Sequence, residues 1–472
     1  MSTPTLPTDQ LLDYITAARW FGGKGRSAEL HAVTPLPWVF ESDDPELPSV
    51  RFEVAELGYP DEPDAVREHY LLGLSYRSAP EPRLEHALIG RAGEGDHDQL
   101  GYDAMRDPQA CRMILTALME QRQLVDPGGE LRFELSVAER LSADLEPQVY
   151  TGQQSNTSVM FGEVAMIKFF RRLELGRNLD IEVHDALNQA GVADVAGLFG
   201  WLEATWTSPN HPGPLVADLA MVVEKLADAH DGWDLALRSV AAASAGSADG
   251  FRADAHELGA ALAATHHALR AAFPTTQLDG AAVAMIMKDR LRRAVGSAAA
   301  LEPYVDGLVR RFDDLGAERL DTQRVHGDFH LGQTLHTPGG WKIIDFEGEP
   351  VKTLAERAAP DSVHRDIAGM LRSFDYAAAS APGPLSQEWA QACRTAFLTG
   401  YAGNPLTGQE AAVLRAYEAD KAVYEVVYEV RNRPDWVDIP LAAVAVLARS
   451  VNGSRTRGPD HDPDLPQTQV EE

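Results

Sequence analysis

Apolar and β-branched residues in the first part of the chain gather in short runs that turn-forming residues separate. An opening helical stretch is followed by three such runs, at 30–41, 50–57 and 69–76, each flanked by proline, aspartate or glycine. Runs of this length between turn residues predict β-strands. Residues 1–90 are therefore expected to hold one helix and a small sheet.

The pattern changes at Asp107-Pro108, a pair typical of a helix start. A helical run covers 103–123, and the pair Gly128-Gly129 predicts a turn directly after it. From 130 to about 228 strand-like runs surround one helical run, so this part is expected to be rich in strands.

Beyond residue 230 the apolar positions recur at three- and four-residue steps, as in 251–273 and 417–433. This period predicts amphipathic helices. After residue 452 the chain has too few apolar residues to pack, and the tail is predicted to be disordered.

Composition narrows the function classes. A hydrophobic content of 44% supports buried cores, and no apolar run is long enough to predict a membrane span. Without a secretory signal, Cys111 and Cys393 are expected to be reduced thiols of a cytoplasmic protein. The net charge of −29 argues against nucleic acid or an anionic membrane as partner. A nucleotide would need local cations or a divalent metal.

Lys168 stands in the middle of an apolar strand pattern within 149–173. A buried lysine needs an anionic partner, and the helical run that follows offers Glu182. A strand lysine paired with a helix glutamate grips phosphates in protein-kinase-like lobes. The polar turn before the strand lacks the kinase glycine pattern but offers hydroxyls and amides for phosphate oxygens, at Ser155, Asn156, Thr157 and Ser158. The alternative is an ordinary hairpin with Lys168 at its surface.

The apolar strand over 219–223 ends in Glu224, Lys225 and Leu226 and leads into a helix. In a kinase-like lobe this junction is the hinge that meets the adenine edge, so Glu224 and Leu226 are candidate nucleotide contacts.

The segment HGDFHLGQTLHTPGGWKIIDFEGEP, 326–350, gathers acids, histidines and a glutamine. Asp328 suits a base that accepts the proton of an attacking hydroxyl, with Gln333 as an oxygen ligand of Mg²⁺. Asp345 ends a strand after a glycine turn and suits the same ion, and Glu347 points the same way as a further ligand.

A metallohydrolase site made from His326, Asp328 and His330 is the rival interpretation, because alternate residues of a strand share a face. Against it, Gly327 indicates a loop, and the adjacent His266 and His267 diverge on a helix. In a kinase loop His326 would bond backbone, and His330 would do the same or touch substrate.

Taken together, the motifs GQQSNTSVMFG, IKFFRRLELGRNLDIEV, HGDFHLGQTL and IIDFEGEP resemble the aminoglycoside phosphotransferase and choline kinase branch of the protein-kinase-like fold. The chain resembles the actinobacterial maltokinases more closely than it resembles the wider branch, and the motif RWFGGKGR resembles their N-terminal cap. The resemblance implies an α+β, bilobal fold with a strand-rich N-lobe, a helical C-lobe and an N-terminal α/β cap. The implied division is a cap over 1–100, an intermediate region with the N-lobe over 101–228, the C-lobe with the catalytic loop over 229–452, and the tail 453–472.

The resemblance also assigns roles: Asp328 matches the catalytic aspartate, Gln333 and Asp345 the metal ligands, and Lys168 with Glu182 the phosphate-gripping pair. Gln333 departs from the asparagine of the wider kinase pattern but keeps an amide oxygen. RWFGGKGR, 19–26, lacks the Walker spacing and is expected to be a structural turn of the cap.

The implied activity is transfer of the ATP γ-phosphoryl group, with Mg²⁺, to the anomeric hydroxyl of maltose, giving maltose 1-phosphate for α-glucan (glycogen) synthesis. Trehalose synthase, to which some family members are fused, or another α-glucan enzyme is the implied partner of this chain, which is expected to stand alone. A glucosamine kinase is the alternative within the class, and a non-catalytic nucleotide or sugar sensor is the alternative outside it.

The sugar is expected to lie against Asp328 in a cleft that the helical half lines. Helical steps of three, four and seven place aromatic and charged side chains on one face, those of Lys421, Tyr424, Glu425 and Tyr428. The candidate sugar contacts are His330, Arg372, Asp375, Tyr376, Lys421, Tyr424, Glu425, Tyr428 and Trp436. The alternative for this face is ordinary helix packing. Asp366 is expected to cap a helix or brace the catalytic loop.

Overall fold

The structure is a computed structural model that describes residues 5–61, 66–93, 99–137, 140–152, 156–246, 251–316, 318–350 and 352–449. Ser155 of the predicted phosphate turn and the predicted disordered tail, 453–472, lie outside these residues. The chain forms two compact units, the first from Met1–Gln277 with Leu320–Leu406 and the second from Leu278–Arg319 with Thr407–Glu472.

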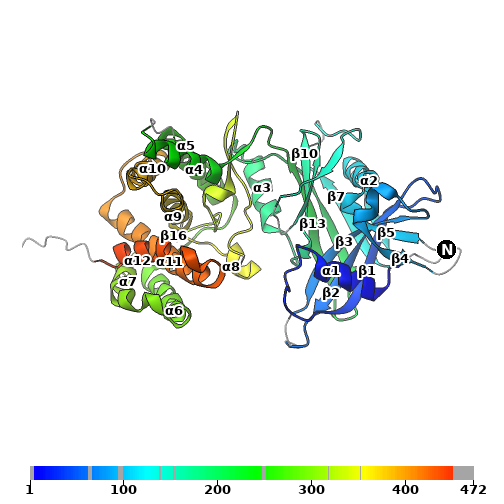
Figure 1. Cartoon of the computed structure of the whole chain (residues 1–472), viewed down its shortest axis with the longest axis horizontal. Helices are drawn as coiled ribbons and strands as arrows, with labels where there is room; N and C mark the ends of the chain where they lie inside the picture. The colour runs from blue at the N-terminus through cyan, green and yellow to red at the C-terminus, as the bar shows by residue number, and fades with distance from the viewer. Residues whose placement is uncertain are drawn as a thin grey trace, which may run out of the picture. The chain divides into compact units, whose positions relative to one another are not determined.

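The first unit begins with an antiparallel sheet in the order β1-β2-β3-β5-β4, and the short strand β11 pairs with β3 (Figure 1). The strands expected at 30–41, 50–57 and 69–76 are confirmed as β1, β2 and β3. The elements are α1 (Thr8–Ala17), β1 (Glu29–Phe40), β2 (Ser49–Gly58), β3 (Glu68–Arg77), η1 (Pro82–Ala87), β4 (Leu88–Ala92), β5 (Gln99–Asp103), η3 (Ala104–Arg106) and β11 (Arg172–Leu173).

Every residue of β2 is buried, because both faces of the strand are covered. Successive side chains of a strand point to opposite faces. Phe52 and Val54 therefore join the core of the following sheet, whereas Ala55 joins a smaller core with Ile15 of α1. The N-terminal region thus shares its main hydrophobic core with the next sheet rather than packing as an independent body.

The second sheet has seven strands in the order β6-β7-β12-β13-β10-β9-β8. Helix α2 begins where predicted, because Asp107 accepts hydrogen bonds from the amides of Gln109 and Ala110 and Pro108 occupies the first turn. The elements are α2 (Pro108–Met119), β6 (Gln123–Asp126), β7 (Gly129–Leu135), β8 (Pro147–Val149), β9 (Thr157–Phe161), β10 (Ala165–Phe169), α3 (Leu179–Gln189), β12 (Leu198–Thr207) and β13 (Pro214–Glu224).

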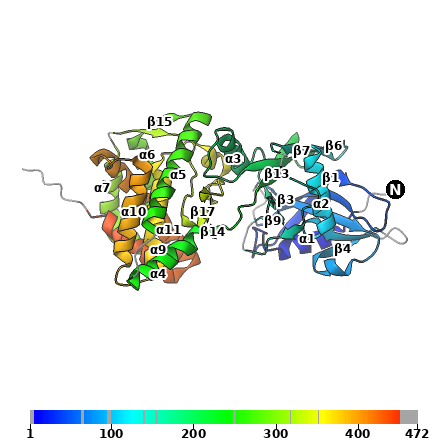
Figure 2. The ribbon, with the colours of Figure 1, turned by 90° about the horizontal axis from the view of Figure 1, so that it is seen from above.

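Helices dominate the rest of the first unit, and α5 lies along α10 (Figures 1 and 2). Two glycines allow this close approach: a Cβ on Gly259 would lie 2.1 Å from the carbonyl oxygen of Phe397, and one on Gly400 would lie 2.0 Å from that of His256. The elements are β14 (His230–Asp231), α4 (Gly232–Ser244), α5 (Phe251–Ala272), η5 (Leu331–Gln333), β17 (Thr334–Thr337), β18 (Gly340–Ile343), α8 (Leu354–Ala358), α9 (His364–Ser380) and α10 (Ser386–Ala402).

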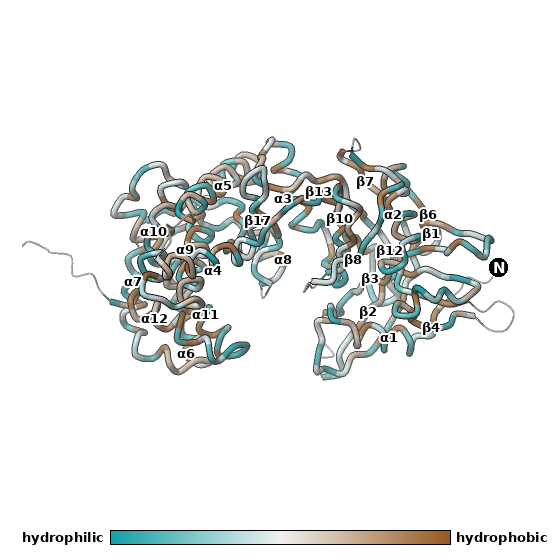
Figure 3. Tube along the Cα trace, turned by 45° about the horizontal axis from the view of Figure 1, so that its top comes forward, coloured by the Kyte–Doolittle hydropathy of each residue, from teal (hydrophilic) through white to brown (hydrophobic). Residues whose placement is uncertain are grey.

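The second unit is helical, and the chain passes between the units within the short strands β15 (Thr276–Asp279) and β16 (Arg319–Thr322). Thr407 and Glu410 form a reciprocal capping box that starts its longest helix. Figure 3 shows both hydrophilic and hydrophobic positions along these helices. Among the described helices, none has both the length and the apolar character needed to cross a membrane. The helices are α6 (Gly280–Ser297), η4 (Ala299–Tyr304), α7 (Val305–Asp313), α11 (Gly408–Asn432), η6 (Pro434–Trp436) and α12 (Asp438–Leu447).

Candidate functional site

Lys168 lies at the centre of a cluster of carboxylates in the first unit. Its Nζ is 3.0 Å from Asp180, 3.2 Å from Asp345 and 2.7 Å from Glu347. Burial alone would lower the pKa of Lys168, but the three carboxylates raise it well above its usual value. The ammonium is therefore held charged, and the ordinary surface hairpin is excluded.

The alternation of β10 explains how the strand presents this lysine. Ala165, Ile167 and Phe169 are buried in the sheet core, and Met166 and Lys168 occupy the opposite face. In the pairing with β9, Lys168 stands opposite Ser158 of the predicted phosphate turn.

The predicted pairing of Lys168 with Glu182 is wrong in this structure. The carboxylate of Glu182 lies 3.0 Å from Arg324, and Asp180, two residues earlier, takes the lysine. Residues two apart on a helix point about 200° apart, so only one of the two acids can face β10. Asp180 was missed because both acids stand in the first turn of α3 and the sequence does not fix the rotation of that helix.

Asp180 also joins helix α3 to the segment that carries Asp345. Its second oxygen accepts the backbone N–H of Phe346 at 3.0 Å and lies 3.1 Å from Nδ1 of His184. Burial opposes ionisation of this carboxyl, yet Lys168 and His184 hold its pKa far below the usual range.

Asp345 adopts a left-handed backbone conformation with φ of 67°, which is uncommon for a residue other than glycine. Gln333 donates its side-chain amide to Asp345 at 3.2 Å, so these two predicted metal ligands lie together. The hairpin of β17 and β18 positions both residues, and its turn at Gly339-Gly340 lies where the sequence predicts it.

Carboxylates of Asp180, Asp345 and Glu347 could hold a metal ion, since one oxygen of each lies within 4.8 Å of the others. Burial raises the pKa of Glu347, and Asp345 and Asp180 raise it further against the attraction of Lys168. A divalent cation with a preference for oxygen ligands fits such a set. Among the described residues this is the one such group of His, Cys, Asp or Glu. It does not coincide with the His326, Asp328 and His330 triad of the metallohydrolase interpretation.

Asp366, a fully buried residue of α9, holds the backbone of the loop that carries Asp328. Asp366 accepts the amides of His326 at 2.7 Å and Gly327 at 2.8 Å, and its carboxylate lies 2.9 Å from Nε2 of His266. The predicted brace of the catalytic loop is therefore confirmed. Although burial raises the pKa of Asp366, these bonds and the neighbouring histidines hold it below its usual value.

The two histidines of the loop support its conformation. Nε2 of His326 lies 3.0 Å from the carbonyl oxygen of Ile344, and its ring packs against Phe346. His330 caps the short helix η5 by accepting the amide of Gly332, and its Nε2 lies 3.9 Å from Asp328. The predicted backbone bond of His326 is confirmed.

In the predicted phosphate turn, the Thr157 hydroxyl accepts a hydrogen bond from Nε of Arg171 at 2.8 Å, and Ser158 is buried. Asn156 directly precedes β9, the strand that begins at Thr157. At the predicted hinge the Glu224 amide donates to the carbonyl of Gly197 at 2.7 Å, so this N–H is not available to a base. Leu226 packs beside the sheet core.

The predicted sugar contacts divide between the two units. On α9, Asp375 pairs with Arg372 at 2.8 Å and with Arg394 at 3.2 Å, and the Arg372 guanidinium lies 5.5 Å from the Tyr376 ring. This helix also supports the catalytic loop, because Ser373 accepts the amide of Leu331.

In the second unit, Lys421 lies 5.1 Å from the ring of Tyr424, which stacks on Tyr428, and Arg433 lies over both Tyr428 and Trp436. These cations and rings form one row with Glu425, which is buried on the same helix. Their place beside Asp328 remains a prediction.

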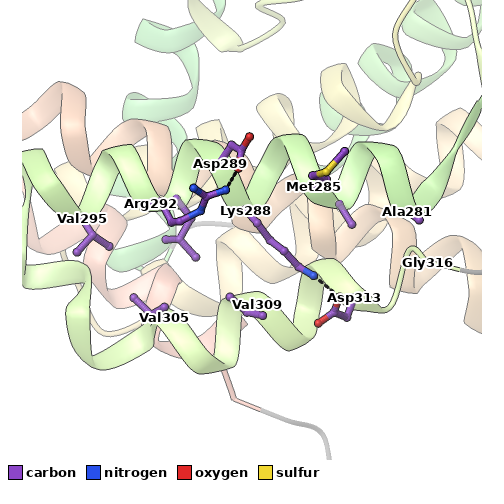
Figure 4. A pocket seen from close by; sticks show the side chains of 12 residues that line it. Ala281, Met285, Lys288, Asp289, Arg292, Val295, Val305, Val309, Asp313 and Gly316 are labelled. Carbon is purple, nitrogen blue, oxygen red and sulfur yellow. Dashed lines mark hydrogen bonds and ion pairs between the residues drawn. The ribbon is translucent and has the colours of Figure 1, made fainter.

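The second unit also contains a cavity of about 650 Å³ between α6 and α7 (Figure 4). Most of its lining is apolar, and its charged side chains engage each other in the pairs Lys288–Asp313 and Arg292–Asp289. This arrangement differs from the lysine and carboxylate cluster of the first unit.

Two family models match this chain, one in its N-terminal region and one further along. Residues 14–107 match the model of the maltokinase N-terminal cap domain, and residues 168–417 match that of the phosphotransferase enzyme family. A glucosamine kinase of Streptacidiphilus jiangxiensis is 31% identical over 318 residues, 61% of this chain and 70% of the relative. One of Mycolicibacterium smegmatis is 30% identical over 327 residues, 63% of this chain and 78% of the relative.

A solved glucosamine kinase in complex with glucosamine, ADP and inorganic phosphate aligns with a TM-score of 0.64 and 22% identity, covering 94% of this chain and 100% of that chain. A second crystal form of glucosamine kinase aligns with a TM-score of 0.64 over 92% of this chain and 98% of that chain. At this identity the likeness concerns the fold, and the predicted α+β architecture, rich in strands first and helical afterwards, is confirmed.

Proposed function

Because the chain belongs to the phosphotransferase enzyme family and has its protein-kinase-like fold, we propose that it transfers the γ-phosphoryl group of ATP to a hydroxyl of a sugar. The observation that carries the proposal is the cluster of Lys168, Asp345 and Glu347, with Gln333 beside Asp345. Kinases of this fold hold phosphates and metal with such a set.

The nucleotide would meet Lys168, whose ammonium is charged and oriented by its carboxylate neighbours. Ser158 of β9 stands opposite it in the strand pairing. Asp345, Glu347 and the amide oxygen of Gln333 would hold Mg²⁺. This ion supplies neutralisation of the charge that develops on the phosphoryl oxygens.

Asp328 would accept the proton of the attacking sugar hydroxyl. The loop that carries it is fixed by Asp366 through two backbone amides, so the carboxylate needs little reorganisation when the sugar arrives. Transfer then depends on positioning and charge more than on covalent chemistry of the protein.

For the acceptor we propose maltose, phosphorylated at its anomeric hydroxyl to give a precursor for α-glucan synthesis. The match of residues 14–107 to the maltokinase cap supports this choice. The stacked rings of Tyr424 and Tyr428 suit the apolar faces of a disaccharide.

Glucosamine is the second candidate acceptor. Relatives described as glucosamine kinases align over 61% and 63% of this chain. An acid-rich acceptor pocket would favour this cationic amino sugar, whereas aromatic platforms would favour a disaccharide.

Release of ADP measured with maltose, glucosamine, glucose and an aminoglycoside, with and without Mg²⁺, tests the proposal. We expect turnover that depends on Mg²⁺ and on one of the first two sugars. Asp328→Asn should remove turnover while nucleotide binding persists. If Asp328→Asn keeps sugar-stimulated turnover near the wild-type rate, the assignment of Asp328 as the base is refuted. If the wild type shows no sugar-stimulated turnover, the result favours a non-catalytic sensor.

A further inference from the structure

Directly after the strand that carries Lys168, the polypeptide passes from the seven-stranded sheet, which contains β10, to the first sheet, which contains β3. Strand β10 ends at Phe169, and Arg172 with Leu173 pairs with the edge of β3. Arg171 lies at the crossing, where its carbonyl accepts the amide of Leu71 at 2.8 Å. The residue three positions after the phosphate-gripping lysine therefore belongs to the contact between the two sheets.

The guanidinium of Arg171 is buried and anchored on the N-terminal side. It donates to both oxygens of Asp103, at 3.0 and 2.9 Å, and Tyr14 donates its hydroxyl to the same carboxylate at 2.8 Å. The ring of Trp20 lies 5.1 Å from the guanidinium. Trp20 belongs to RWFGGKGR, so this motif contributes a packing surface for Arg171.

The same guanidinium reaches the predicted phosphate turn. Its Nε donates to the hydroxyl of Thr157 at 2.8 Å, and Thr157 is the first residue of β9. The next residue, Ser158, stands opposite Lys168. One buried side chain thus connects the N-terminal region with the strand that carries the turn.

We propose that Arg171 is a positioning residue for nucleotide binding, through which Asp103 and Tyr14 fix Thr157 at the start of β9. The inference rests on the proposed kinase function. The charge of Arg171 is matched by Asp103 in a bidentate pair, so the effect on phosphate is exerted through the position of Thr157 rather than by direct attraction. On this account the N-terminal region acts on nucleotide binding through Arg171.

A purely structural role would give a different result. A buried arginine–aspartate pair also holds the two sheets together, and its loss would lower stability and the amount of active protein without a selective change in nucleotide affinity. A positioning role acts on the nucleotide alone. The constant to follow is therefore the affinity for Mg²⁺-ADP and the KM for ATP, compared with the KM for the sugar.

Thr157→Val removes the hydroxyl and keeps the shape of the side chain, and Thr157→Ser keeps the hydroxyl. We expect Thr157→Val to weaken Mg²⁺-ADP binding, measured by calorimetry, roughly tenfold, because a buried N–H of Arg171 loses its acceptor. The KM for the sugar should stay unchanged, and Thr157→Ser should restore binding.

Arg171→Lys is compared with Arg77→Lys as a matched control. Arg77 makes a similar buried bidentate pair, with Asp107, and also donates to Gln109 at the start of α2. Both variants should lose stability, but only Arg171→Lys should weaken nucleotide binding.

Equal nucleotide affinity of Thr157→Val and wild type, within about twofold, overturns the inference. Equal weakening by Arg77→Lys and Arg171→Lys overturns it as well, and this comparison decides the matter if Thr157→Val does not fold. A wild-type protein that binds no Mg²⁺-ADP contradicts the proposed function instead, so the two failures are distinguishable.

Discussion

Replacing Asp180 by asparagine tests which acid of helix α3 holds Lys168. The amide keeps an oxygen that can accept the N–H of Phe346, so the local backbone is expected to persist. What is lost is the charge 3.0 Å from Nζ of Lys168. Glu182→Gln is the matched control, because it makes the same acid-to-amide change two residues along the same helix.

The contacts of Lys168 set the size of the effect. Breaking a buried ion pair costs about 3–5 kcal/mol when the remaining charge is left alone. Lys168 keeps Asp345 and Glu347, so the loss should approach that of one charge-assisted hydrogen bond, about 2 kcal/mol. If this energy orients the lysine toward phosphate, kcat/KM for ATP falls roughly thirtyfold.

Glu182 pairs with Arg324, and 36% of its side chain is exposed. Partly exposed pairs contribute about 0.2–1 kcal/mol, so Glu182→Gln should lower kcat/KM by about fivefold or less. The assay is the initial rate of ADP release at saturating sugar with ATP varied. A larger loss in Glu182→Gln than in Asp180→Asn would refute the assignment and restore the pairing that the sequence predicted.

Three further substitutions test the stability of the fold, the first of them at the support of the Asp328 loop. Asp366→Asn should destabilise the protein by about 2–3 kcal/mol at pH 7, because one buried amide loses a charged acceptor. Since the pKa of Asp366 is held below its usual value, its contribution is complete above about pH 4 and is lost as the pH falls through the folded-state pKa. The difference from wild type in urea unfolding should therefore shrink in acid, and a constant difference would contradict the assignment. Gly400→Ala places a Cβ 2.0 Å from the carbonyl oxygen of His256 and should destabilise by about 1–3 kcal/mol. Gly296→Ala, exposed on α6 with open space around it, should stabilise by about 0.5–1 kcal/mol, and thermal unfolding compares the two.

Sequence reasoning located the elements whose causes are local. The strand pattern around Lys168 follows from a two-residue alternation, and helix α2 follows from Asp107-Pro108. Gln333 and Asp345 lie together because they stand at the two ends of the β17–β18 hairpin, whose strands a glycine-containing turn joins. In these cases the residues that determine the structure lie within a few positions of it.

Contacts between distant segments could not be predicted in the same way. Whether Asp180 or Glu182 faces Lys168 depends on the rotation of α3, which is set by packing of residues such as Val183 and Leu187. Arg171 is adjacent to a second arginine, and nothing near it in the sequence indicates Asp103 as its partner. The predicted helical spacing of Lys421, Tyr424, Glu425 and Tyr428 is confirmed in α11, but spacing cannot say which sugar they would meet.

The strongly acidic composition can be reconciled with a nucleotide substrate at the level of the site. A net charge of −29 opposes a polyanion at long range, but salt screens charges beyond about 10 Å. Close to Lys168 three carboxylates face one ammonium, so the cluster keeps an excess of negative charge. A divalent cation bound there would cancel this excess of negative charge and give phosphate oxygens a second cation beside the lysine. The acids that would repel ATP alone are thus the groups that would bind ATP together with Mg²⁺, so the proposed function does not require a basic surface.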